Sequence, residues 1–267
     1  MGLLSKSSEF TLPESSTNES HPYIQEYFDL GEQMKAGNQC DVRAYEDRIY
    51  KVVEENLIAS MFEYVTEENL GVQDRIEAEI NALELEEIGI NVPSIINHYD
   101  NVLEMEKLEG VNLDELIEDV DNYNALKEIG AITGAQLKDM TANGYVKMDY
   151  LFANIWAETS NIQDNSAYNL EETHMHSSQL PSNPENEGIP VFQIDNELMI
   201  ENPSEIEIKI SEAIILSDIR SFGYEKSSPL EEGFKEEYGE VDGDVEALAE
   251  LRGKSVYAFS RLHDIIN

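Results

Sequence analysis

Residues 40 to 55, CDVRAYEDRIYKVVEE, contain two β-prone runs on either side of the turn-prone pair Glu46-Asp47. Two such runs around a short polar turn are typical of a β-hairpin. The second run, RIYKVV, carries Lys51 in its middle. We therefore expect a hairpin whose second strand places one lysine among apolar and β-branched residues.

Residues 72 to 88 follow with an amphipathic helical pattern, in which acidic residues occupy the face opposite the apolar one. The apolar positions at helical spacing are Ile76, Ile80, Leu83 and Ile88. Gly89 is a stop signal for this helix. A second predicted hairpin, VPSIINHY and NVLEMEKLEG, turns at Asp100-Asn101, and residues 113 to 142 read as helix broken near Asp121-Asn122.

This order of elements predicts the α+β class, with a small antiparallel β-rich lobe that includes one helix and a larger, mainly helical lobe. We expect the first lobe over residues 23–108 and the second over residues 109–267. Residues 1–22, rich in Ser, Glu, Thr and Pro, indicate a mobile leader. Residues 159–188 have few apolar anchors and indicate a solvated, poorly ordered insertion.

The C-terminal half has a less regular pattern. VFQIDNELMI and EIEIKISEAIILSDI read as two further β-like runs, and residues 243 to 265 predict a last helix with a core-facing apolar stripe. His174 and His176 in the polar insertion offer a metal pair in principle, but histidines in such a loop without a nearby cysteine are usually solvated.

The charge of the chain is extreme, because 56 acidic residues oppose 17 basic ones and give a formal net charge of -39. The acids recur in almost every segment, which indicates adaptation to solvent rather than one acidic tail. Molar salt shortens the screening length to about 3 Å and removes the repulsion, so we expect a halophilic, cytoplasmic protein. Such a surface disfavours nucleic acid and anionic membranes as partners.

Cys40 is the only cysteine, which excludes an intramolecular disulfide and favours a reducing compartment. No apolar run approaches the length of about 18 residues that a membrane span requires, and the N-terminus lacks the features of a signal peptide. These patterns predict a soluble protein.

The segment GYVKMDYLFANIW carries Asp149 and, five positions later, Asn154. A loop of this length can present a carboxylate to a substrate hydroxyl and turn an amide oxygen toward a magnesium ion that bridges phosphates. The spacing alone arises by chance in many chains, so its context decides its meaning.

In that context, residues 37 to 156 resemble the protein-kinase-like superfamily, particularly its small prokaryotic branches such as RIO-type kinases and aminoglycoside phosphotransferases. RIYKVV resembles the strand whose lysine holds the α- and β-phosphates of ATP, which implies this role for Lys51. EAEINALELEEIGINVPSII resembles the helix whose glutamate pairs with that lysine. Glu79 fits the glutamate best, and Glu77 is a close rival.

VLEMEKLEGVNLDEL resembles the hinge between the lobes. The resemblance implies that Met105 lines the adenine pocket and that backbone groups from Glu106 to Leu108 hydrogen-bond the base. KMDYLFANIW resembles the catalytic loop, with Asp149 as the base and Asn154 as a metal ligand.

Three departures from the family pattern affect this interpretation. Lys147 stands where the catalytic loop normally begins with a histidine that braces it, and the expected phosphate-covering loop offers only Gly31 and Gly37. The aspartate that supplies the second metal ligand has two candidates. Asp218 ends an apolar run in AIILSDIRSFG and is preferred, while Asp195 in VFQIDNELM is the alternative, because Asp195-Asn196 also reads as a hairpin turn.

The resemblance implies an ATP- and Mg²⁺-dependent phosphotransferase that moves the γ-phosphoryl group to a hydroxyl of a protein or small molecule. The alternative is a catalytically inactive pseudokinase that acts as a protein-binding module. The sequence does not identify the acceptor.

Overall fold

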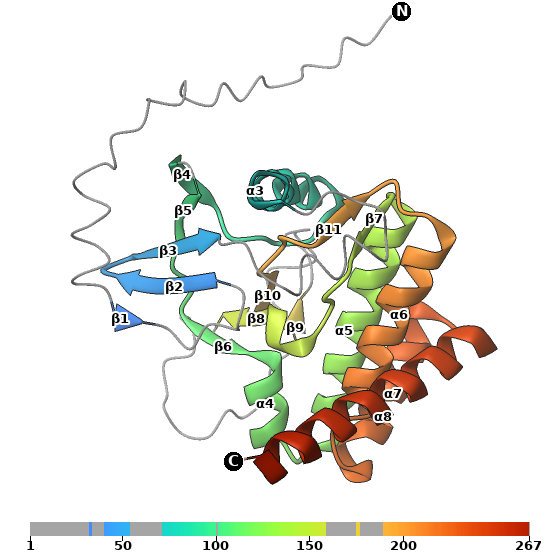
Figure 1. Ribbon diagram of the computed structural model, residues 1–267. Coiled ribbons are helices and arrows are strands. Elements are labelled where there is room, and N and C mark those ends of the chain that lie inside the picture. Colours follow the sequence, from blue (N-terminus) through green and yellow to red (C-terminus); the bar gives the residue numbers. More distant parts are fainter. Residues whose placement is uncertain are drawn as a thin grey trace, which may run out of the picture.

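The computed structural model describes residues 32–33, 40–53, 71–99, 101–158, 175–176 and 189–266. Its first layer is a five-stranded antiparallel sheet in the order β1-β2-β3-β5-β4, on the left in Figure 1. The strands are β1 Glu32–Gln33, β2 Cys40–Tyr45, β3 Arg48–Val53, β4 Ile95–Tyr99 and β5 Val102–Glu106. Both expected hairpins, β2–β3 and β4–β5, are therefore confirmed.

Helix α3, Val72–Asn81, packs against this sheet and continues into the 3₁₀ helix η1, Ala82–Ile88. Gly89 ends this segment in the left-handed conformation, with φ 86°, which glycine adopts at little cost. The small core between sheet and helix contains Val53, Ile76, Leu103 and Met105. Lys51 pairs in register with Leu103 of β5, so it lies on the side of the sheet that faces α3.

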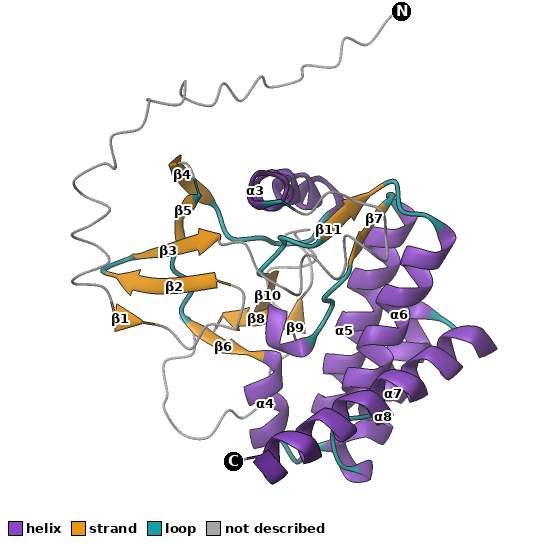
Figure 2. Ribbon diagram, viewed as in Figure 1, coloured by secondary structure: helices purple, strands orange, loops and turns teal. Residues whose placement is uncertain are grey.

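The second lobe begins after β6, Gly110–Asn112, with α4, Leu113–Asp119, and α5, Tyr123–Ala142. Asn112 and Asn122 cap these two helices with their side-chain oxygens, which confirms the break expected near Asp121-Asn122. Helices α6 Glu205–Ile219, α7 Tyr224–Tyr238 and α8 Gly243–Ile266 complete the bundle around α5, as the purple ribbons of Figure 2 show.

Short strands flank the two segments that carry Asp149 and Asp195. Strand β7, Tyr145–Lys147, pairs with β11, Met199–Glu201. Strands β6, β8 Ile155–Glu158, β10 Ile189–Gln193 and β9 Met175–His176 form a second sheet in the order β6-β8-β10-β9. The β7–β11 pairing holds the segment after β7 beside the segment that precedes β11, because Met148 N–H also donates to Leu198 O over 3.0 Å.

Two expectations for the C-terminal half are corrected. EIEIKISEAIILSDI forms helix α6 rather than a strand, started by a capping box between Ser204 and Glu207. The positions from Ala213 to Ser217 are all buried, so the run is apolar on nearly every side and lacks the one-sided period that marks a surface helix. Met175–His176 forms a short strand within the expected insertion, whereas its other residues, including His174, and the leader 1–22 lie outside the described residues.

Helices α5 and α7 approach each other so closely that glycine is required at the contact. A Cβ atom added at Gly130 would lie 2.0 Å from the carbonyl oxygen of Leu230, and one at Gly233 would lie 1.8 Å from that of Lys127. The obstructing atoms belong to backbone, so the helices themselves would have to separate.

We expect Gly130→Ala to lower the free energy of unfolding by about 1–3 kcal/mol through this overpacking. Gly223→Ala is the control, because nothing lies within 4 Å of its added Cβ. Urea unfolding of both variants in molar salt measures the difference, and equal midpoints would contradict the close helix contact.

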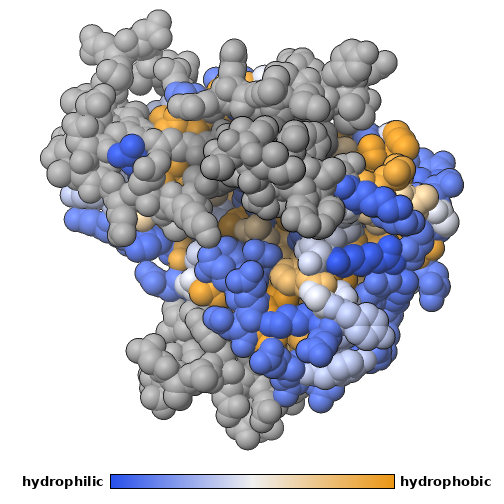
Figure 3. Space-filling model, turned by 60° about the horizontal axis from the view of Figure 1, so that its bottom comes forward, coloured by the Kyte–Doolittle hydropathy of each residue, from blue (hydrophilic) through white to orange (hydrophobic). Residues whose placement is uncertain are grey.

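Hydrophilic residues cover most of the described surface on the face drawn in Figure 3, with hydrophobic residues in small areas between them. Within the described part of the chain, no helix has both the length and the apolar character needed to cross a membrane.

Candidate active site between Lys51 and Asp149

Lys51 is the centre of a buried group of charges contributed by three segments that are distant in the sequence. Its ammonium donates to Glu79 of helix α3 and lies 2.5 Å from Asp195 Oδ1 and 2.8 Å from Glu197 Oε1. The side chain of Lys51 is only 7% exposed, whereas that of Asp195 is 34% exposed. Asp195 is therefore the carboxylate of this group that is most open to solvent.

Helix α3 explains which glutamate reaches the lysine. Glu79 is buried on the face of the helix that packs against the sheet, whereas Glu77 lies on the exposed face. Glu79 Oε1 accepts from Lys51, and Glu79 Oε2 is buried without a hydrogen-bond partner among the described residues. Burial raises the pKa of Glu79, and the charge of Lys51 opposes this effect only in part.

Asp195 lies between β10 and β11, with a left-handed backbone of φ 57°. Non-glycine residues adopt this conformation at a cost, and such positions concentrate at functional sites. Burial opposes the ionisation of Asp195, but the positive charges of Lys51 and Lys147 outweigh it and lower the pKa of Asp195. This carboxyl is therefore held as a carboxylate.

Asp149 and Asn154 lie on the loop that follows β7 and ends in the 3₁₀ helix η2, Phe152–Asn154. The amide nitrogen of Asn154 donates to Asp149 Oδ2 over 2.8 Å and to Asp149 O over 3.0 Å. Asp149 Oδ1 is buried and has no hydrogen-bond partner in the described part of the structure. Burial raises the pKa of Asp149 to about 7, which is in the range that suits a general base near neutral pH.

A backbone hydrogen bond joins this loop to the segment that carries Asp195. Ile194 N–H donates to Asn154 O over 3.0 Å, so Asp195 follows directly after a residue that is fixed to the Asp149 loop. The structure therefore brings together Lys51, Glu79, Asp149, Asn154 and Asp195.

Lys147 replaces the expected histidine without leaving the loop unsupported. Its side chain is buried, and its ammonium donates to the carbonyl oxygen of Ile194. Burial lowers the pKa of Lys147, and the nearby charge of Asp149 opposes this effect. The Lys147 side chain therefore ties the start of the Asp149 loop to the residue before Asp195.

Asp218 does not join the group around Lys51. It lies in helix α6 rather than at the end of a strand, and its carboxylate accepts from the backbone N–H of Phe152 over 2.9 Å. Burial raises the pKa of Asp218 to about 6, although this hydrogen bond opposes the effect. Asp218 therefore binds the backbone of the Asp149 loop at Phe152, whereas Asp195, the alternative candidate, is the aspartate that pairs with Lys51.

The raised pKa of Asp218 predicts a specific dependence of stability on pH. The folded protein binds this proton more tightly than the unfolded chain, so the contribution of Asp218 is most favourable below its unfolded pKa near 3.8 and is lost as pH rises through about 6. Relative to Asp218→Asn, which keeps an oxygen acceptor for Phe152, the wild type should lose on the order of 2–3 kcal/mol between pH 4 and pH 7. Urea unfolding across this range tests it, and parallel pH profiles would contradict it.

The hinge residues lie where β5 leaves the small sheet. Met105 is buried in the core against α3, Glu106 N–H donates to Ser94 O over 3.0 Å, and Lys107 N–H donates to Asp47 O over 3.3 Å. Leu108 follows on the stretch that connects β5 to β6 and is partly exposed. Gly31 and Gly37 of the expected phosphate-covering loop lie outside the described residues.

Arg75 and Glu197 are members of the site that the sequence reasoning did not find. Arg75 Nη1 lies 2.9 Å from Glu197 Oε2, and both side chains are buried. A signal existed, because Arg75 is the only basic residue between positions 72 and 88 and lies one helical turn before Glu79. Glu197 lies two positions after Asp195, in the turn that precedes β11.

Oxygen ligands for a cation are available in this group. Glu79, Asp195 and Glu197 each offer a carboxylate oxygen, and these atoms lie within 4.8 Å of one another. Carboxylate and amide oxygens are the protein ligands that Mg²⁺ prefers. The chemistry of the donors therefore fits magnesium, with Asp195 as the most accessible carboxylate.

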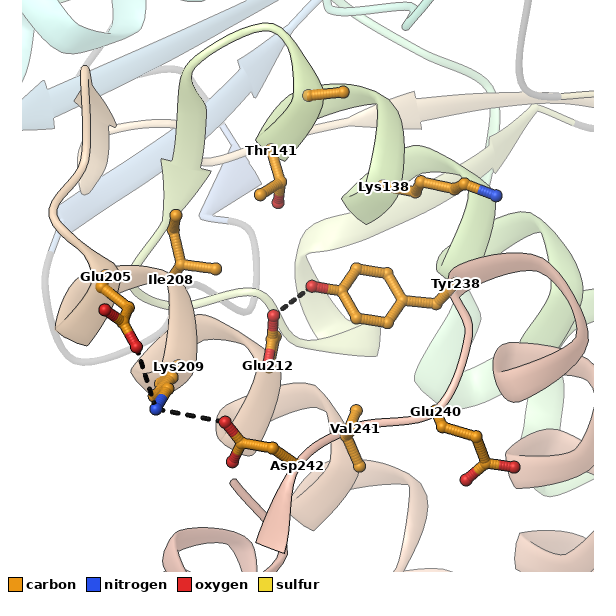
Figure 4. A pocket seen from close by; sticks show the side chains of 11 residues that line it. Lys138, Thr141, Glu205, Ile208, Lys209, Glu212, Tyr238, Glu240, Val241 and Asp242 are labelled. Carbon is orange, nitrogen blue, oxygen red and sulfur yellow. Dashed lines mark hydrogen bonds and ion pairs between the residues drawn. The ribbon is translucent and has the colours of Figure 1, made fainter. Parts of the chain in front are cut away.

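A cavity of about 470 Å³ lies elsewhere, among the end of α5, the first half of α6, the end of α7 and the loop that precedes α8 (Figure 4). Two of its acids are already engaged, since Glu212 accepts from Tyr238 and Lys209 lies 3.1 Å from Asp242. The residues around this cavity include neither Lys51 nor Asp149.

No protein-family model matches the sequence, and no curated protein matches it either. Among solved structures, the chain is similar to WaaP in complex with acyl carrier protein, with 12% identity, a TM-score of 0.53, and coverage of 89% of this chain and 97% of that one. WbdD matches at 14% identity and a TM-score of 0.43, with 83% of this chain covering 49% of that one. The Rio2 kinase-ADP/Mg²⁺-phosphoaspartate complex from Chaetomium thermophilum matches at 13% identity and a TM-score of 0.47, with 86% and 69% covered.

The likeness to WaaP extends over nearly the whole of both chains and shows a shared fold. The order of elements agrees with two lobes: a small antiparallel sheet with one packed helix comes first, and a connecting segment leads to a helical lobe. The chain therefore has a two-lobed α+β fold that it shares with WaaP, and this is the fold class that its sequence predicted.

Proposed function

We propose that this protein is a kinase-like phosphotransferase that binds Mg-ATP between Lys51 and the Asp149 loop and transfers the γ-phosphoryl group to a hydroxyl. The observation that carries the proposal is the convergence of Lys51, Glu79 and Asp195 beside a loop that presents Asp149 and Asn154. Buried charge clusters cost free energy to form, so a cluster of this kind next to an acceptor without a partner favours a functional site over a purely structural one.

In the proposed reaction, the oxygen of the acceptor hydroxyl attacks the γ-phosphorus, the bond from that phosphorus to the β–γ bridging oxygen breaks, and ADP leaves. Asp149 orients the hydroxyl and receives its proton, a role for which its unpartnered Oδ1 and raised pKa are suited. Lys51 binds phosphate oxygens, and Glu79 holds the lysine in position. We place the adenine base beside Met105 and Leu108, because the N–H groups of Glu106 and Lys107 already donate to protein carbonyls.

Asp195 and Asn154 are the residues we assign to magnesium, in place of Asp218. Asn154 uses its amide nitrogen on Asp149, which leaves its amide oxygen for a cation. When bound, magnesium would neutralise charge on the phosphates of the nucleotide. The proposal for Asp195 is supported by its position directly after Ile194, which is bonded to Asn154.

A second candidate function, a pseudokinase that binds a partner protein, is favoured by one observation. Glu197 adds a third carboxylate to Lys51, which competes with phosphate for the ammonium. In that case nucleotide would bind weakly and would not be consumed.

Melting temperatures in molar KCl separate these alternatives from a fold without a nucleotide site. Mg-ATP should raise the melting temperature, and the rise should grow with the nucleotide concentration. At a concentration one hundred times the dissociation constant, the folded state should gain about 2.7 kcal/mol of stability. ATP with EDTA and MgCl₂ alone are the controls. A shift without ADP release in the presence of candidate acceptors supports the pseudokinase, and no shift overturns the proposed function.

A further inference from the structure

Arg75 and Glu197 form an ion pair in the interior of the small lobe, behind the groups that would meet a nucleotide. Their side chains are 0% and 1% exposed, and Arg75 Nη1 lies 2.9 Å from Glu197 Oε2. The two residues are 122 positions apart in the sequence. Burying such a pair is costly, so its presence calls for a reason beyond stability.

Glu197 is shared between two cations. Its Oε1 lies 2.8 Å from Lys51 Nζ, while its other oxygen meets Arg75. Helix α3 thus contributes Arg75 and Glu79 from one face, and the segment before β11 contributes Asp195 and Glu197 from the facing side. In Figure 1, α3 lies close to β11, the strand that follows this segment.

The direct ion pairs of this group contain more carboxylates than cations. Three carboxylates, those of Glu79, Asp195 and Glu197, pair with two cations, Lys51 and Arg75. The buried Lys147 adds a further positive charge that acts on Asp195. When Asp195 turns to a metal-bound nucleotide, two carboxylates and two cations are left. Arg75 then neutralises the carboxylate of Glu197. The ammonium of Lys51 remains able to attract the phosphate oxygens.

We propose that Arg75 is a positioning residue that neutralises Glu197 and thereby keeps Lys51 available to the phosphates of the nucleotide. This inference rests on the proposed function. Without Arg75, more of the charge of Glu197 falls on Lys51, because the buried setting leaves little solvent to screen it. The expected effect is on nucleotide affinity, not only on the stability of the fold.

A double-mutant cycle of Arg75→Met and Glu197→Gln, with Mg-ATP titrated calorimetrically into the folded proteins, tests this role. Arg75→Met should weaken Mg-ATP binding by about tenfold, a typical coupling within a buried charge network. The double variant should return to within about threefold of the wild type, because the glutamine keeps an oxygen for Lys51 but carries no charge. A purely structural role would lower the melting temperature of Arg75→Met and leave the affinity of the folded protein unchanged, which overturns the inference.

Two further variants keep the test decisive if Arg75→Met does not fold. Glu197→Gln alone should bind Mg-ATP as tightly as the wild type or more tightly, and weaker binding would overturn the inference. Arg75→Lys keeps the charge and should stay near the wild-type affinity, and a tenfold loss there would also overturn it. The two possible failures can be told apart. Wild-type protein that does not bind Mg-ATP would overturn the proposed function itself, whereas unchanged affinity in Arg75→Met would overturn only the role of Arg75.

Discussion

Replacing Asp149 by Asn is expected to lower the rate of phosphoryl transfer by about 10²–10⁴-fold while Mg-ATP still binds. Asparagine fills the same space and still accepts from Asn154, but it cannot receive the proton of the acceptor hydroxyl. Removal of a buried charge also relieves its desolvation cost, so the variant should not be less stable than the wild type.

The measurement is single-turnover ADP formation together with a Mg-ATP titration on the same preparation. Asp139→Asn is a matched control, because Asp139 is an exposed aspartate of helix α5. It should keep wild-type rates. An Asp149→Asn variant that turns over at the wild-type rate would remove Asp149 from the chemistry.

Lys51→Met should both abolish Mg-ATP binding and strongly destabilise the fold. The variant leaves Glu79, Asp195 and Glu197 close together, with Arg75 as the cation that still pairs with the group. Breaking a buried ion pair from one side costs about 3–5 kcal/mol, because the remaining charges are left uncompensated. The deficit should shrink at acidic pH, where the orphaned carboxylates can take up protons.

Urea unfolding at neutral and acidic pH measures this loss. Lys107→Met provides the comparison, since the Lys107 side chain is 32% exposed and lies 3.9 Å from the exposed Glu109. It should change stability by less than about 1 kcal/mol. If Lys51→Met and Lys107→Met lost similar amounts of unfolding free energy, Lys51 would not be the centre of a buried charge cluster.

The small lobe was predictable because its signals are local. Hairpin turns, the β-branched strand around Lys51 and the helix that ends at Gly89 each depend on a few adjacent residues. The pairing of Lys51 with Glu79 followed from a resemblance in element order, and the exposed position of Glu77 separates the two glutamates.

Contacts between distant segments could not be read in the same way. Asp195 reaches Lys51 across 144 positions, and nothing in the spacing of the two distinguishes it from Asp218. The segment of helix α6 was expected to be a strand because the consecutive positions Ala213–Ser217 are all buried, and this part of the helix therefore lacks a one-sided period. The hydrogen bond from Lys147 to the carbonyl oxygen of Ile194 could not be predicted either, because the identity of a residue does not show which distant backbone group its side chain reaches.

A calorimetric titration of ATP, with and without Mg²⁺, into the wild type and Asp195→Asn tests most directly whether Lys51, Asn154 and Asp195 form one nucleotide site. We predict that the wild type binds ATP more tightly with Mg²⁺ than without it, and that Asp195→Asn loses this difference. Equal Mg²⁺ dependence in both proteins, or no binding to a folded wild type, would contradict the account.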